Sequence, residues 1–163
     1  MTTAPVRTWK KRGYVLSTDP AKLDMDFVHG ALAASYWSPG VPRTVVEKAA
    51  AHSLTFGLYR TDGTQIGYAR LVTDTATFAY LADVIVAEAE RGKGLGRWMN
   101  ECIVAHPDLR GLRRWMLATR DAHALYRRVG WKQLKAPERF MERHFPAVYE
   151  KKSPPAPSRR RRR

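Results

Sequence analysis

The sequence is poor in cysteine and in acidic residues, and it holds no long apolar run. Cys102 is the only cysteine among 163 residues, which excludes an intrachain disulfide and a cysteine-based zinc site. No run of about eighteen apolar residues occurs, and residues 1–12 lack the apolar core of a signal peptide. We therefore expect a soluble, cytoplasmic protein with no membrane partner and no metal.

The shortage of acidic residues leaves a strong positive charge. The 29 lysines and arginines exceed the 15 aspartates and glutamates, giving a formal net charge of +14. Seven of these cations lie within residues 151–163, which leaves +7 on the rest of the chain. Such a body attracts polyanions, including nucleic acids, anionic membranes and phosphate-bearing cofactors. Charge alone does not choose among them.

Length and composition predict one compact domain. Hydrophobic residues make up 44% of the chain and aromatic residues 10%, as in ordinary globular proteins. We assign residues 1–12 to a flexible lead-in and residues 13–150 to the folded domain. Residues 151–163 combine three prolines with Arg159 to Arg163, a composition typical of a disordered basic tail.

Three antiparallel strands are predicted in the middle of the chain. Residues 54–59, 65–72 and 77–86 are rich in β-branched and aromatic side chains and are separated by turn-forming residues. The third run is almost continuously apolar, which indicates a central strand covered on both faces, and Asp83 is its one interruption.

Helical spacing and short apolar runs define the remaining elements. Apolar residues recur at helical intervals between residues 94 and 105, which predicts an amphipathic helix against the sheet. Asp121 is expected to cap a later helix and Gly130 to follow its end. The other expected elements are helices at 23–35, 44–53 and 121–128, strands at 14–17 and 115–118, and closing strands at 131–134 and 140–145.

A glycine-rich loop follows the third strand and opens the helix at residues 94–105. Glycines let a ligand approach the backbone closely, and the free N–H groups of a helix N-terminus attract anions. Arg91 and Lys93 add cationic donors, so the loop suits a pyrophosphate. A Walker loop and a dinucleotide fingerprint both fit poorly, and a strand-to-helix turn without a ligand is the plain alternative.

These residues resemble the GNAT superfamily of acyl-CoA-dependent N-acyltransferases. The family loop has the form Arg/Gln-x-x-Gly-x-Gly/Ala, which Arg91, Gly94 and Gly96 match. A second family feature, Ala-Leu-Tyr followed by a glycine-aromatic pair, matches residues 124–126 and 130–131. The resemblance spans roughly residues 14–145 and leaves both ends of the chain outside it.

The resemblance implies a mixed α/β fold and a cosubstrate. The family fold is a mostly antiparallel sheet of about six to seven strands with about four helices and a splay between two central strands. The cosubstrate is acetyl-CoA, its thioester carbonyl near an amide of Ile85 or Val86. The residues implied in binding acetyl-CoA are Val84, Ile85, Val86, Arg91, Gly92, Lys93, Gly94, Leu95, Gly96 and Tyr126.

Two residues are candidates for proton transfer. Tyr126 is the candidate acid that reprotonates the departing thiolate, or else it packs on its helix and hydrogen-bonds the sulfur. Asp83 lies where burial would make its carboxylate a usable base, or else backbone groups or an arginine satisfy it. His123 ranks below Asp83.

The acceptor is not identified by any motif. In this family the first helices and their loop shape the acceptor pocket, which suggests Tyr36 and Trp37 as lining residues, although Trp37 fits equally as a core residue. The family's asparagine near the last helix is replaced here by Thr119-Arg120-Asp121, which places that cofactor contact in doubt.

Together these features predict an acetyltransferase. We expect direct attack by the amine of a small molecule or peptide on acetyl-CoA in a ternary complex. The alternative is a catalytically silent CoA-binding or nucleic-acid-binding module that uses the basic surface and residues 159–163 for weak contacts. A homodimer is expected by analogy with the family alone.

Overall fold

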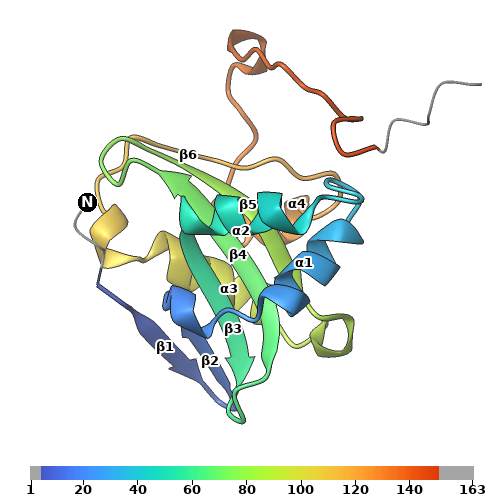
Figure 1. The fold of residues 1–163 in the computed structure, drawn as a ribbon. Helices are drawn as coiled ribbons and strands as arrows, with labels where there is room; N and C mark the ends of the chain where they lie inside the picture. The colour runs from blue at the N-terminus through green and yellow to red at the C-terminus, as the bar shows by residue number, and fades with distance from the viewer. Residues whose placement is uncertain (1–4, 151–163) are drawn as a thin grey trace, which may run out of the picture.

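The computed structural model describes residues 5–150 as an open six-stranded sheet with helices on both faces (Figure 1). The strands follow one another across the sheet in chain order; β1 to β5 are antiparallel, and β6 joins β5 in parallel. The strands are β1 (Thr8–Lys11), β2 (Tyr14–Ser17), β3 (Leu54–Arg60), β4 (Gln65–Thr73), β5 (Phe78–Val86) and β6 (Arg114–Met116).

Four α-helices and four short 3-10 turns complete the described chain, and the predicted fold class is confirmed. The helices are α1 (Met25–Ala33), α2 (Arg43–Ala51), α3 (Leu95–Val104) and α4 (His123–Arg127). The turns are η1 (Pro20–Lys22), η2 (Glu88–Glu90), η3 (Pro107–Leu109) and η4 (Pro137–Arg139). Within residues 5–150, no helix has the length and apolar character needed to cross a bilayer.

An irregularity in β5 sets the geometry of the sheet. β4 and β5 pair at Tyr68 with Ile85 and at Arg70 with Ala82. Two residues of β5 therefore stand opposite one residue of β4, which defines a β-bulge. Asp83 lies in this bulge with a left-handed φ of 55°, a conformation that aspartate tolerates better than most residues. The aspartate interrupts the apolar strand at the point where its pleat changes.

The bulge shifts the alternation of side chains by one residue. Leu81 before it and Val84 after it both pack into the core on the α3 side of the sheet. Ile85 packs on the opposite side, with the cluster beneath α1 and α2. In a regular strand Leu81 and Ile85 would share a face. The bulge therefore also places the Asp83 side chain on the α1–α2 face of the sheet.

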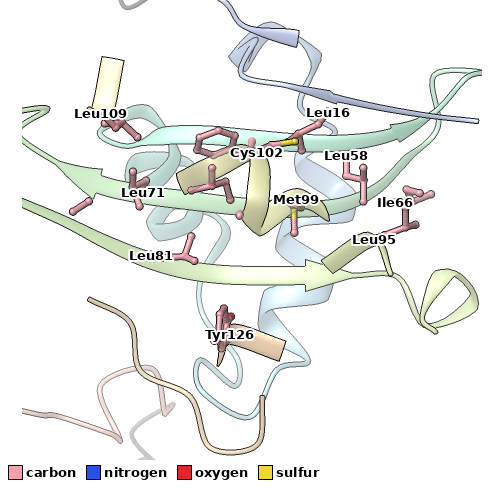
Figure 2. Close-up of a cluster of buried hydrophobic side chains, with 14 residues drawn as sticks. Leu16, Leu58, Ile66, Leu71, Leu81, Leu95, Met99, Cys102, Leu109 and Tyr126 are labelled. Atoms are coloured by element: carbon pink, nitrogen blue, oxygen red, sulfur yellow. The ribbon is translucent and has the colours of Figure 1, made fainter. Parts of the chain in front are cut away.

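Each face of the sheet has its own apolar cluster. On one face Leu95 and Met99 of α3 pack against strand residues such as Leu58 and Leu71 (Figure 2). Cys102 is buried in the same cluster, where burial raises the pKa of its thiol to about 11, so it acts as a core residue. The smaller cluster on the other face consists of Val28, Leu32, Val41, Val46 and Tyr68.

Three expectations about secondary structure were wrong. Strand β1 forms within residues 1–12, which we had assigned to a flexible lead-in; its side chains are mostly exposed, so the sequence shows no apolar alternation there. Residues 131–134 and 140–145 form no strand, because a strand-like composition does not supply a pairing partner.

The third wrong expectation concerns a helix cap. Asp121 caps no helix; instead the Ala122 amide donates to the Thr119 hydroxyl at 3.0 Å. The expected basic tail, residues 151–163, lies outside the described residues.

Two glycines provide a paired test of this packing. A methyl group on Gly67 would lie 2.8 Å from the carbonyl oxygen of Ile85, beside the bulge, so Gly67→Ala should destabilise the protein by about 1–3 kcal/mol. Gly30 lies inside α1 with open space around it, so Gly30→Ala should stabilise by about 0.5–1 kcal/mol. Urea unfolding monitored by circular dichroism measures both changes, and a Gly67→Ala protein as stable as the wild type would contradict the tight β4–β5 contact.

Candidate active site

The sheet opens between its last two strands. β5 and β6 pair only where Phe78–Tyr80 runs beside Arg114–Met116. From Leu81 to Val86, β5 has no strand partner on the β6 side within the described residues. The predicted splay is therefore confirmed, and it leaves backbone N–H and C=O groups available to an extended ligand.

The glycine-rich loop continues directly from this open edge. Gly92 and Gly94 both adopt left-handed backbone conformations, with φ of 79° and 74°. Helix α3 then begins at Leu95, and its N-cap residue Gly94 makes no side-chain capping hydrogen bond. The first amides of α3 are therefore not occupied by a capping side chain, and the positive end of the helix dipole coincides with them. This arrangement fits a pyrophosphate.

Gly96 has a packing function as well. A methyl group on it would lie 3.2 Å from a terminal carbon of Leu125 and 3.8 Å from a side-chain carbon of Val86. The absence of a side chain lets α3 lie close to α4 and to the end of β5. A bulky substitution here would therefore disturb helix packing together with the loop.

A buried carboxylate anchors the loop. Glu90 accepts hydrogen bonds from the Lys93 ammonium at 2.7 Å, from Arg60 Nε at 2.8 Å and from the Tyr14 hydroxyl at 3.1 Å. These donors, Lys93 first, lower the pKa of Glu90 to about 2. The Lys93 ammonium, predicted to face a phosphate, is thus held by a carboxylate. Glu90 was not among the residues predicted for the site, although its position directly before a cationic glycine loop was a visible signal.

The Arg91 side chain also turns back to the protein. Its Nε donates to the carbonyl oxygen of Val86 at 3.2 Å. Since Val86 ends β5, this bond joins the glycine loop to the open edge of the sheet. The predicted cofactor residues of β5 and of the loop are therefore contiguous in space.

The predicted acceptor residues form a bridge across the splay. The Trp37 indole donates to an Asp83 carboxylate oxygen at 3.2 Å, and the Trp37 and Tyr36 rings meet edge to face with centroids 4.9 Å apart. The Arg120 guanidinium lies 3.7 Å from the centre of the Tyr36 ring, and the Arg120 amide donates to the Tyr36 hydroxyl at 3.2 Å. This aromatic bridge joins the bulge of β5 to the chain that follows β6. Trp37 is 44% exposed, which is incompatible with a core role.

Both carboxylate oxygens of Asp83 have partners. One accepts from Trp37, and the other forms an ion pair with the Arg70 guanidinium. Arg70 lies on β4 opposite the bulge, so the pair links the two strands where their ladder is irregular. The arrangement corresponds to the alternative in which an arginine satisfies the carboxylate. The role of Asp83 as a base stays a prediction.

Tyr126 lies on α4 beneath the splay (Figure 2). Its ring meets the Trp131 ring at 71° with centroids 6.1 Å apart, and it lines a cavity of about 450 Å³ together with His123. Burial, with a smaller effect of Tyr36, raises the pKa of its phenol to about 12. Among the described residues we find no hydrogen-bond partner for its hydroxyl. Tyr126 is thus protonated at neutral pH and free to donate.

The Glu90 anchor makes a prediction about acid stability. Because its pKa is lowered from 4.5 to about 2, its contribution to folding is complete above pH 4.5 and is lost as the pH falls through 2. Glu90→Gln should be less stable than the wild type at pH 7, and its stability should fall less steeply between these pH values. Glu88→Gln, an exposed change in the same turn, is the matched control. Urea midpoints measured across this range test it, and a wild-type acid slope in Glu90→Gln would contradict the anchor.

Comparisons with known proteins agree with this geometry. A family model, "Acetyltransferase (GNAT) family", matches residues 25–131. A Gibberella zeae protein named "Putative acetyltransferase FG08082" is 33% identical over 152 residues, which cover 79% of this chain and 85% of that protein. A crystal structure titled a "putative acetyltransferase belonging to the gnat family" from Xanthomonas campestris is 42% identical, with a TM-score of 0.81 over 85% of this chain and 97% of that one.

More distant structures share the fold alone. Glucosamine-6-phosphate N-acetyltransferase from Arabidopsis thaliana is 13% identical, with a TM-score of 0.56 over 86% of this chain and 97% of that one. The family match covers the splayed strands, the glycine loop and Tyr126. The chain belongs to the GNAT family of acetyltransferases.

Proposed function

We propose that the protein transfers an acetyl group from acetyl-CoA to the amine of a small molecule or peptide by direct attack in a ternary complex. The observation that carries this proposal is the open edge of β5, which leads into a glycine-rich loop and the uncapped start of α3. Family membership supports acetyl transfer in general. The nitrogen acceptor and the order of events are our inference.

The chain offers two sets of backbone groups to acetyl-CoA. Val84, Ile85 and Val86 lie on the open edge and would pair with its pantetheine arm, while the amides from Arg91 to Gly96 would hold its pyrophosphate. When bound, acetyl-CoA supplies the acetyl group as a thioester. An amide near Ile85 or Val86 would stabilise the charge that develops on the carbonyl oxygen.

Proton transfer completes the proposed reaction. The amine nitrogen forms a bond to the acetyl carbon, the bond from that carbon to sulfur breaks, and the nitrogen loses one proton. Tyr126 donates its phenolic proton to the departing sulfur and recovers one from solvent. Asp83 is the proposed acceptor of the amine proton, and the Arg70 and Trp37 contacts fix its carboxylate at the bulge.

A pair of valine substitutions tests the cofactor loop. Gly94→Val places a β-branched residue at a left-handed position and should weaken acetyl-CoA binding at least about tenfold. Gly63→Val carries the same backbone penalty in the β3–β4 turn, where φ is 90° and nothing surrounds the added group, and should bind like the wild type. Calorimetric titration of acetyl-CoA measures both, and equal affinities in the two variants would refute the assigned loop.

Tyr126→Phe tests the proposed acid. The variant should keep its affinity for acetyl-CoA and lose about 10²–10⁴-fold in kcat. Because the pKa of Tyr126 is about 12, the wild-type rate should show no fall caused by this group between pH 7 and 10. CoA release followed with a thiol reagent gives both quantities. Turnover unchanged in Tyr126→Phe would remove Tyr126 as the acid.

A further inference from the structure

A second cavity lies on the α1–α2 face of the sheet. It measures about 70 Å³ and is bounded by α2, the loop between α1 and α2, and strands β4 and β5. Its walls are mostly apolar, as at Val41 and Val46, and Tyr68, Arg70 and Asp83 line its polar side. Ser38 and Tyr149 also line it, and the Ser38 hydroxyl donates to the carbonyl oxygen of Leu32 at 3.0 Å. It thus shares Asp83 with the aromatic bridge and lies beside the proposed cofactor edge, since Val84 follows Asp83 directly.

The Tyr68 hydroxyl in this wall has no partner. The side chain is fully buried, and the oxygen makes no hydrogen bond among the described residues. Burial and the nearby Asp83 carboxylate both raise the pKa of this phenol. A buried hydroxyl without a hydrogen bond costs free energy, so proteins rarely keep one without a reason. A bound polar group would satisfy it.

The outer wall of the cavity comes from the end of the described chain. After α4 the chain leaves the sheet, passes through η4 and returns toward the loop between α1 and α2 (Figure 1). Tyr149 is partly buried there and packs against the cluster formed by Val28, Leu32, Val41, Val46 and Tyr68. Its neighbour Val148 is 65% exposed. Tyr149 therefore covers the cavity, while the residue before it faces outward.

The chemistry of the walls defines what would fit. A hydroxyl and a carboxylate on one side suit a primary amine, and the apolar remainder suits a short hydrocarbon substituent. The cavity volume is about that of two water molecules in the liquid, so the cavity has room for about two or three carbon atoms. The Arg70–Asp83 ion pair has no net charge, and the Asp83 oxygens can still accept a further hydrogen bond from an amine.

We propose that this cavity receives the substituent of a small primary amine, that Tyr68 and Asp83 bind its nitrogen, and that Tyr149 sets the length of acceptor that the enzyme accepts. The inference rests on the proposed function, because it names the acceptor class of that same reaction. It assigns a specificity-determining role to a residue far from the cofactor loop in sequence.

A series of linear amines tests the length limit. With saturating acetyl-CoA, kcat/KM is measured for ethylamine, propylamine, butylamine and hexylamine. The wild type should favour ethylamine and propylamine, and Tyr149→Ala should raise the ratio of hexylamine to ethylamine at least about tenfold. Val148→Ala, an exposed change next to it, should leave the ratio unchanged. An unchanged ratio in Tyr149→Ala would overturn the inference.

Tyr68→Phe and acetyl-CoA titration separate this inference from the proposed function. Tyr68→Phe should raise KM for ethylamine while leaving the calorimetric Kd for acetyl-CoA unchanged. If acetyl-CoA binds the wild type but neither the wild type nor Tyr149→Ala acetylates any amine of the series, the acceptor class is wrong and the cofactor assignment stands. If acetyl-CoA does not bind at all, the proposed function itself fails.

Discussion

The bulge in β5, held by the Asp83–Arg70 ion pair, is the feature on which the rest of the site depends. One extra residue bends a strand and increases its twist, and the bulge follows closely on Tyr80, the last residue of β5 that pairs with β6. The same residue reverses the side-chain alternation, so that Asp83 and Ile85 belong to the α1–α2 face. The bulge thus lies within the segment of β5, from Leu81 to Val86, that has no partner on the β6 side among the described residues.

The two faces of the sheet contribute different parts of the proposed reaction. The α3 face supplies a large apolar core and the start of α3, where the glycine loop meets the end of β5. The α1–α2 face supplies the small cavity with Tyr68 and Asp83. The open edge of β5 lies between these two faces. In the proposed reaction, the cofactor and the acceptor would approach from opposite faces and meet at this edge.

The sequence predicted the elements that are defined by local patterns. Helical periodicity predicted α3, β-branched and aromatic composition with turn residues predicted β3 to β5, and the glycine spacing predicted the loop. The splay between two strands was predicted from the family resemblance alone. Side chains that work through long-range contacts were not predicted: the Glu90 anchor depends on Tyr14 and Arg60, and the cover of the small cavity depends on Tyr149. No local sequence pattern indicates contacts between residues that lie so far apart in the chain.

Hydrogen exchange in the presence and absence of acetyl-CoA tests the central claim most directly, because it reports on individual backbone amides. If the open edge and the loop bind the cofactor, amides between Val84 and Val86 and between Arg91 and Arg97 should exchange more slowly when acetyl-CoA is added. The amides of Ala76, Thr77 and Phe78, in the turn at the opposite end of β5 from the loop, should be unaffected. Saturating acetyl-CoA that leaves both segments unprotected would contradict the account.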